Sequence, residues 1–216
     1  YPVIEKLKSE FPHLRIAIHS ALLDETRAKR MEAAGVDTAM MDVIGAQETI
    51  RDVYHLDRPV DDFEATLESL CSTSMEVVPH IVIGLHYGRT VGEANALDIC
   101  ARHGIHALVL VIVMPFYARA GTFSTPATRD VGEIFLEARQ RLANKQVLLG
   151  CARPPGMVRR VIDSYAVMAG LDGIAFPADG MVALAEVIGR PYHQEHACCS
   201  IKLGGESDLA RGQYAA

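Results

Sequence analysis

Six short apolar runs, rich in β-branched residues, recur along the chain at regular intervals. A clear example is residues 77–83, VVPHIVI, in which five of the seven side chains are valine or isoleucine. Runs of this length and composition are typical of strands buried on both faces, as in a parallel sheet. We therefore predict six strands, at residues 14–18, 38–43, 77–83, 107–114, 146–150 and 173–176.

Between these runs the apolar residues recur with the spacing of amphipathic helices. Asp24 precedes one such stretch and suits an N-cap, whereas Gly35 and Gly170 follow two others and suit helix ends. The pair Phe11-Pro12 ends the first stretch. The pattern predicts helices at residues 2–10, 25–34, 47–54, 61–72, 91–103, 130–143, 157–169 and 181–188.

The alternation of strand and helix sets the predicted fold class. Strands this apolar need cover on both faces, and a regular βα repeat implies parallel pairing with right-handed crossovers. Eight such units close a TIM-type barrel. We predict an α/β fold, an incomplete TIM-like barrel of an N-terminal helix plus six parallel βα units, with two units missing upstream of Tyr1. Residues 1–190 would form this one domain, and the polar, glycine-rich residues 191–216 an irregular tail.

Composition narrows the class of partner. The chain has 216 residues, half of them hydrophobic, a formal net charge of −6 and a pI near 5.8, which argue against nucleic acid or an anionic membrane surface as a partner. No apolar stretch is long enough to span a bilayer. The chain starts at Tyr1 within a helical pattern, so we expect a processed or truncated product. Its five cysteines suggest a reduced, cytoplasmic setting.

The chemistry-bearing residues gather at the predicted carboxyl ends of the strands, where ligands bind in such folds. His19, Asp42, His80 and Met114 all lie at or near these ends. Polar groups facing a barrel interior are costly to bury and more often serve a ligand, so we assign His19, His80 and Met114 to substrate binding. Two simpler alternatives stay open: either histidine could be a core residue bonded to backbone, and Asp42 could cap the turn that follows.

Common catalytic and nucleotide-binding signatures are missing from the sequence. The glycines after residue 83 do not follow the GxGxxG spacing, and there is no P-loop, GxSxG or HExxH motif. An aldolase or lyase that forms a Schiff base would need a lysine at a strand end. Every lysine instead lies on a helix, just before a strand or in the tail.

Cys151 follows the fifth predicted strand directly. A cysteine at a barrel mouth could be a nucleophile, a soft metal ligand or a buried filler, and thiolates suit iron–sulfur clusters. The adjacent Cys198 and Cys199 could fold back to supply further ligands.

Several segments, taken in order over residues 16–188, resemble a known family. They are HSALLD, DVIGAQETIRDVYHLDRPVDDF, VVPHIVIGLHYGRTVGEANALDI, VMP with a later GT, LLGCARPPG and GIAFP. Their combination is similar to the radical S-adenosylmethionine proteins related to biotin synthase, and most of all to the group that includes the second subunit of the two-protein lipoyl synthases. The resemblance implies an α/β barrel whose [4Fe–4S] cluster cleaves S-adenosylmethionine to a 5′-deoxyadenosyl radical.

The resemblance also implies roles for individual residues, although it names no catalytic residue. The S-adenosylmethionine contacts of the family fall on Asp42, Arg58, Ile83, Gly84 and Leu85. Arg153 stands where biotin synthase has an arginine that ligates an auxiliary cluster. We therefore expect Arg153, together with the cysteines Cys151, Cys198 and Cys199, to bind metal.

The sequence departs from the family in one important way, because it has no CxxxCxxC motif. The ligands of the radical-generating cluster are therefore not in this chain, and we expect them upstream. The expected function is that of the carboxyl-terminal portion of a radical S-adenosylmethionine enzyme, inserting sulfur as biotin and lipoyl synthases do. Its substrate would be a small molecule or a lipoyl carrier, with a possible second synthase subunit. The alternative is a catalytically degenerate barrel that binds S-adenosylmethionine or a partner protein.

Overall fold

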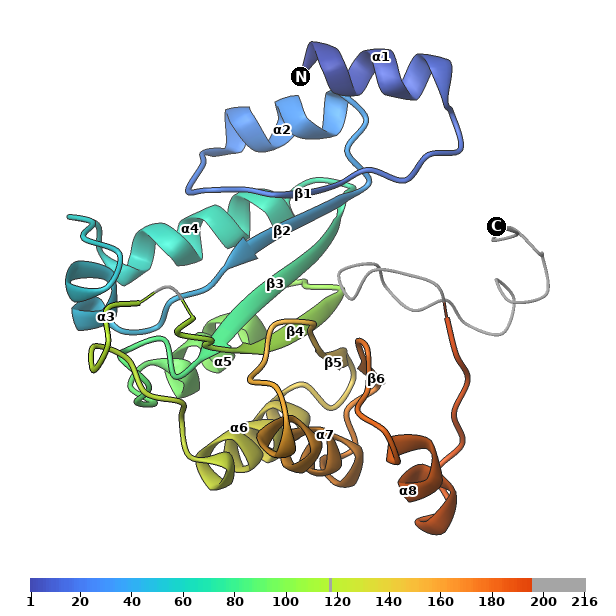
Figure 1. The fold of residues 1–216 in the computed structure, drawn as a ribbon. Coiled ribbons are helices and arrows are strands. Elements are labelled where there is room, and N and C mark those ends of the chain that lie inside the picture. The colour runs from blue at the N-terminus through green and yellow to red at the C-terminus, as the bar shows by residue number, and fades with distance from the viewer. Residues whose placement is uncertain (117, 196–216) are drawn as a thin grey trace.

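The computed structural model describes residues 1–116 and 118–195. Within them, six strands form one sheet in the order in which they occur along the chain, and every neighbouring pair is parallel. Figure 1 shows the sheet curving from β1 to β6 with the helices around its outside. The strands are β1 (Ala17–His19), β2 (Thr38–Asp42), β3 (Glu76–Ile83), β4 (Ala107–Ile112), β5 (Gln146–Leu149) and β6 (Gly173–Ile174).

The prediction of an incomplete α/β barrel with six parallel βα units is confirmed. Each strand is followed by a helical segment that returns the chain to the other end of the sheet, as parallel pairing requires. The helices are α1 (Pro2–Glu10), α2 (Glu25–Ala33), α3 (Gln47–Asp52), α4 (Val60–Cys71), α5 (Glu93–Arg102), α6 (Thr128–Arg141), α7 (Met157–Ala169) and α8 (Met181–Val187).

Two apolar layers lie on the two faces of the sheet. The larger layer packs the outward side chains of the strands, such as Met41 and Ile81, against α2, α4, α5, α6 and α7. The smaller layer lies on the concave face and contains Val78, Ala107, Val109 and Leu148, with Met40 and Val111 packed against them. Alternate residues of each strand therefore serve opposite layers, which explains why the strands read as continuous apolar runs.

The first and last strands are shorter than predicted, for local reasons. Residues 14–16 precede β1, and the Ile16 amide donates to the Asp37 carboxylate at 2.6 Å. The sixth strand stops at Ile174 because Phe176 adopts a left-handed conformation, with φ of 49°. Arginine side chains, and not a neighbouring strand, bind the Phe176 carbonyl.

Two further predictions concern the C-terminal tail and membrane-spanning helices, and the described residues cover them only in part. The predicted irregular tail, 191–216, lies outside the described residues from position 196 onward. Among the helices of the described residues, none has the length and apolar character to cross a membrane.

Candidate functional site

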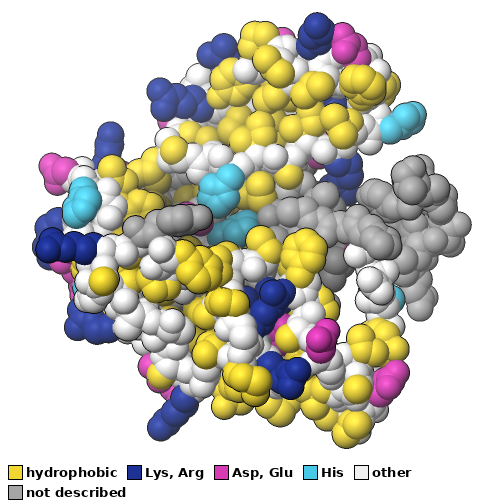
Figure 2. All heavy atoms as spheres, in the orientation of Figure 1, with side chains coloured by type: hydrophobic (Ala, Val, Ile, Leu, Met, Phe, Trp, Pro, Cys, Tyr) yellow, Lys and Arg dark blue, Asp and Glu magenta, His cyan; other side chains and the backbone are white. Residues whose placement is uncertain are grey.

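The concave face of the sheet carries a polar cluster at its carboxyl end. His19 ends β1, Asp42 ends β2, and the β2–β3 register pairs Asp42 with His80. Figure 2 shows histidine side chains in the middle of this face, between apolar side chains. The alternation along the strands places these polar residues on the same face as Met40 and Val78. The cluster thus lies at the rim of the hollow on the concave face, and the apolar side chains of Val78, Val109 and Leu148 beneath it are buried.

Asp42 is the centre of this cluster. Its Oδ1 lies 3.4 Å from Nε2 of His19, and its Oδ2 accepts a hydrogen bond of 3.2 Å from the hydroxyl of Tyr54, just beyond α3. The His19 side chain is 45% exposed and that of Asp42 is 32% exposed. Both groups are therefore held by the protein and still accessible from the hollow.

His80 completes the cluster from β3. Its ring centroid lies 5.3 Å from that of His19, and its Nδ1 is 3.2 Å from the Val78 carbonyl oxygen. The residue is 8% exposed. His80 is thus largely enclosed, with its ring fixed beside that of its more exposed neighbour.

The environment separates the two histidines electrostatically. The hydrogen bond to Asp42 raises the pKa of His19 above its ordinary value. Burial, assisted by the charge of His19, lowers the pKa of His80 to about 4. Burial also pushes the pKa of Asp42 upward, but the hydrogen bond and charge of His19 outweigh it and the net shift is downward. The pKa of Tyr54 is raised, by burial first and then by Asp42. At neutral pH the cluster therefore holds an ionised Asp42 carboxylate and a neutral His80, and His19 is the more basic of the two histidines.

The glycine-rich loop after β3 is packed against another loop. A Cβ on Gly84 would lie 2.8 Å from Cγ of Pro126, and one on Gly88 would lie 2.3 Å from the Ser124 carbonyl oxygen. Both glycines also have positive φ values. In this structure they admit the loop between β4 and α6, which is a structural reason for glycine. The expected contact of Gly84 with a cofactor stays a prediction.

Glu93 holds the same loop together from its position at the start of α5. Its Oε1 accepts the Gly84 amide at 2.8 Å, and its Oε2 accepts the amides of Val91 and Gly92. His86 is likewise used locally, since its Nδ1 lies 3.1 Å from the Thr49 hydroxyl. These contacts give Glu93 and His86 a structural role.

The other residues expected at the cofactor or substrate are placed differently. Ile83 is fully buried in the layer against the helices, and Leu85 packs against the same layer. Arg58 is exposed beyond α3 and lies 3.4 Å from Asp62. Met114 is half-buried just beyond β4. Among the predicted site residues that the structure describes, His19 contacts both Asp42 and His80.

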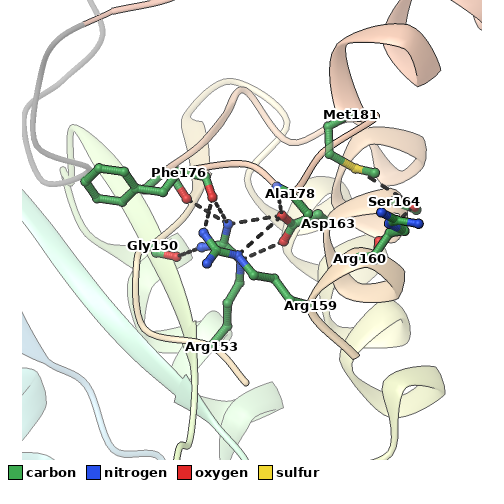
Figure 3. Close-up of polar contacts among 10 residues, drawn as sticks. Gly150, Arg153, Arg159, Arg160, Asp163, Ser164, Phe176, Ala178 and Met181 are labelled. Carbon is green, nitrogen blue, oxygen red and sulfur yellow. Dashed lines mark hydrogen bonds and ion pairs between the residues drawn. The ribbon is translucent and has the colours of Figure 1, made fainter. Parts of the chain in front are cut away.

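Arg153 does not face the hollow. Figure 3 shows its guanidinium group between the end of β5 and α7, bound to both carboxylate oxygens of Asp163 at 2.6 and 3.1 Å. It also donates to the carbonyls of Gly150, Ala175 and Phe176. Neither side chain of the Arg153–Asp163 pair is exposed. The expected ligand of an auxiliary cluster is thus engaged in joining β5, α7 and the loop after β6.

The described residues do not assemble a metal centre around Cys151. Cys151 is exposed. The other described cysteines, Cys71 and Cys100, lie on helices and pack in the core as small residues. No group of three histidine, cysteine or acidic side chains suited to a metal ion occurs within residues 1–116 and 118–195. Cys198 and Cys199 lie outside the described residues.

Two residues that matter here were not singled out by the sequence reasoning. The pattern predicts Tyr54 only as the last residue of the helix 47–54, and nothing in the neighbouring sequence distinguishes it from a surface tyrosine. Asp163 did carry a signal, because it is an acidic residue that falls on the apolar face of the predicted helix 157–169. A buried acid of this kind requires a partner.

Comparison with solved structures identifies the architecture. A crystal structure of HydG, described as a maturase of the [FeFe]-hydrogenase, matches with a TM-score of 0.61 at 14% sequence identity, over 80% of this chain and 41% of its own. The HydG of Carboxydothermus hydrogenoformans matches with a TM-score of 0.60 at 18% identity, over 96% of this chain and 48% of its own. The fold is an α/β barrel of the kind found in HydG.

The same architecture occurs in another class of enzyme. Hydroxymethylglutaryl-CoA lyase from Pseudomonas aeruginosa matches with a TM-score of 0.56 at 10% identity, over 79% of this chain and 55% of its own. No protein-family model and no curated protein sequence matches the chain. The chain spans about half the length of these solved structures. At such identities the likeness shows the fold, and function has to be argued from the site.

Proposed function

We propose that this chain is part of a radical S-adenosylmethionine enzyme of the biotin and lipoyl synthase type, and that the whole protein inserts sulfur into its substrate. The observation that carries the proposal is the position of Asp42, at the carboxyl end of a barrel strand and at the centre of a polar cluster above buried apolar side chains. The HydG-like fold and the ordered resemblance of residues 16–188 to that family support it.

The donor set of the hollow suits part of S-adenosylmethionine. The Asp42 carboxylate is held from two sides and still partly exposed, so it can accept hydrogen bonds from the hydroxyl groups of a ribose. Arg58, which the resemblance places at the methionine carboxylate, lies apart from this cluster; its side chain is 63% exposed and lies 3.4 Å from Asp62, so it can receive a carboxylate. When bound, S-adenosylmethionine would supply the hydrogen-abstracting chemistry of the family.

The iron–sulfur clusters of the family do not fit the described residues. These residues offer no trio of thiolate or imidazole ligands at one place, and Arg153 is committed to Asp163. No step can therefore be assigned to a cluster held by residues 1–116 or 118–195. The contribution of this part of the protein is to bind the reacting groups and to orient them.

Calorimetric titration of the chain with S-adenosylmethionine tests the proposal. We expect saturable binding, weakened about tenfold or more, or by about 1.4 kcal/mol, in Asp42→Asn and in Arg58→Ala. Asp61→Asn is the matched control, because Asp61 is an exposed acid on the outer helix α4, and it should bind as the unmodified chain does. Absence of binding, or equal binding by all variants, would reject the proposed cofactor.

An assay for the reaction product 5′-deoxyadenosine separates the main proposal from its alternative. The natural full-length protein, given S-adenosylmethionine and a reductant, should form 5′-deoxyadenosine. Binding without 5′-deoxyadenosine would instead support a catalytically degenerate barrel that binds S-adenosylmethionine or a partner. Transfer of sulfur to a small molecule or to a lipoyl carrier, alone or with a second subunit, would then be tested on the active protein.

A further inference from the structure

The contact between His19 and Asp42 orients the imidazole ring. Because Nε2 faces the carboxylate, the neutral ring keeps its proton on Nε2, and the lone pair lies on Nδ1. Asp42 cannot turn away freely, since its other oxygen accepts the Tyr54 hydroxyl at 3.2 Å. Within the described residues no hydrogen-bond partner is found for Nδ1 of His19. This is the arrangement of a base that is held by a carboxylate and open on its other side.

The groups around His19 keep its proton equilibrium well defined. Asp42 from β2 raises its pKa, and Tyr54 beyond α3 shares that carboxylate. His80 from β3 is the one nearby group of like charge, but burial lowers its pKa to about 4, so it stays neutral at neutral pH. No other charged side chain is in contact with His19 among the described residues. Of the two histidines, His19 is therefore the one that binds a proton more readily.

The surroundings restrict what could exchange that proton. A second carboxylate beside Asp42 would be repelled. A hydroxyl or thiol can instead give its proton to Nδ1 and needs no charge of its own. The fitting ligand is a molecule with one hydroxyl or thiol group.

We propose that His19 is an acid–base residue of the hollow, exchanging a proton between Nδ1 and the hydroxyl or thiol of a ligand, with Asp42 as its positioning residue. In the forward direction the O–H or S–H bond breaks, an N–H bond forms on His19, and the ligand keeps the electron pair as an alkoxide or thiolate. No electron is gained or lost. The inference goes beyond the proposed function and needs a ligand in the hollow, not S-adenosylmethionine.

Modification by diethyl pyrocarbonate, followed by peptide mass spectrometry, tests the base. The reagent acylates unprotonated imidazole nitrogen, so His19 should react readily and His80, which is 8% exposed, slowly. In Asp42→Asn the midpoint of the His19 pH profile should move to lower pH, because Asp42 raises the pKa of His19. A His19 as protected as His80, or a midpoint unchanged in Asp42→Asn, would overturn the proposal. Asp61→Asn should leave the profile as it is.

A pair of probe ligands tests the proton exchange on the unmodified chain. Hexane-1-thiol carries an S–H group, whereas hexyl methyl sulfide has a similar apolar body without one. In nitrogen-15 spectra of histidine-labelled protein, the thiol should shift the Nδ1 signal of His19 and the sulfide should not. Equal shifts with both probes, or none with the thiol, would overturn the proposal. S-adenosylmethionine is absent from both experiments, so their failure is distinct from a failure of the proposed cofactor.

Discussion

At the residue scale, the hollow shows that one type of side chain can have two roles a few ångströms apart. His19 ends β1, whereas His80 lies within β3 on the other side of β2, and the sequence allows the same two interpretations of both histidines. The structure separates them, because His80 is largely enclosed and bonded to the Val78 carbonyl, as a core histidine would be, whereas His19 is exposed and bound to Asp42. Exposure, which depends on neighbouring strands, decides between the readings.

His80 should make the stability of the protein depend on pH. Its pKa is about 4 in the folded chain against an ordinary value of 6.5, so below pH 6.5 the unfolded chain binds a proton that the folded chain refuses. Stability should fall between pH 6.5 and 4, by about 3 kcal/mol from this group. Between pH 7 and pH 4.5, urea unfolding should show a smaller loss of unfolding free energy in His80→Gln than in the unmodified chain. A full loss in His80→Gln would contradict the assignment.

The Arg153–Asp163 pair should be essential as a pair. Removing one partner leaves a buried charge without compensation, so Arg153→Met should cost about 3–5 kcal/mol of unfolding free energy. The double variant Arg153→Met with Asp163→Leu should lose less than Arg153→Met alone, since no charge is left behind. Chemical denaturation measures both. Arg129→Ala, which breaks an exposed pair with Glu133, serves as the control and should lower the unfolding free energy far less than Arg153→Met does.

At the element scale, the loops at the carboxyl ends of the strands are joined to one another and leave little freedom. The loop after β2 is packed against the start of α5, where the Asn95 side chain donates to the Gly45 carbonyl at 2.8 Å. The loop after β3 is held by Glu93 and covered by Pro126. The resemblance predicts that Gly84 contacts a cofactor. In the structure, the absence of a side chain at Gly84 and at Gly45 lets neighbouring loops pack closely.

Gly45 should tolerate no side chain, unlike a glycine in an open turn. A Cβ at Gly45 would lie 2.2 Å from the Gly92 carbonyl oxygen and 2.5 Å from the Ala96 amide nitrogen, and both are backbone atoms that cannot easily move. Gly45→Ala should therefore cost at least about 1–3 kcal/mol. Gly104→Ala is the matched control, because a Cβ there meets nothing within 4 Å, and its stability should change by under about 1 kcal/mol. Thermal unfolding of both variants makes the comparison, and equal effects would refute it.

At the scale of the whole molecule, the protein is an open curved sheet with a continuous outer layer and a smaller inner one. The outer layer contacts α2, α4, α5, α6 and α7, so it ties β2, β3, β4 and β5 into one cooperative core. The edge strands β1 and β6 have three and two residues and exposed or half-buried side chains. Stability is therefore concentrated in the middle of the sheet, while the polar cluster spans from its centre to one edge.

Native-state hydrogen exchange should map this difference. Amides in the centre of β3 and β4, such as those of Ile81 and Leu110, should exchange only through global unfolding. The amide of Ile18 in β1 should open locally and exchange much faster. Exchange of Ile18 as slow as that of Ile81 would contradict the proposed distribution of stability.

The sequence by itself determined the order of the elements and the class of fold. Short apolar runs alternating with amphipathic stretches have few physical solutions, so six parallel strands and the two helices 2–10 and 157–169 could be placed from the pattern alone. The positions of Asp42, His19 and His80 at or near strand ends followed from the same pattern. Their assignment to a cofactor or a substrate remains a prediction.

Only the tertiary structure decided which of these residues contact one another and which form structural contacts elsewhere in the protein. Whether a strand-end side chain points to the hollow or to the helices depends on a two-residue alternation and on the register with its neighbours, neither of which is visible in one sequence. For this reason Asp42 could be joined with His19 and Tyr54, while Arg153, equally close to a strand end, was taken by Asp163 of α7. Local sequence specifies elements, and the packing of distant elements specifies partners.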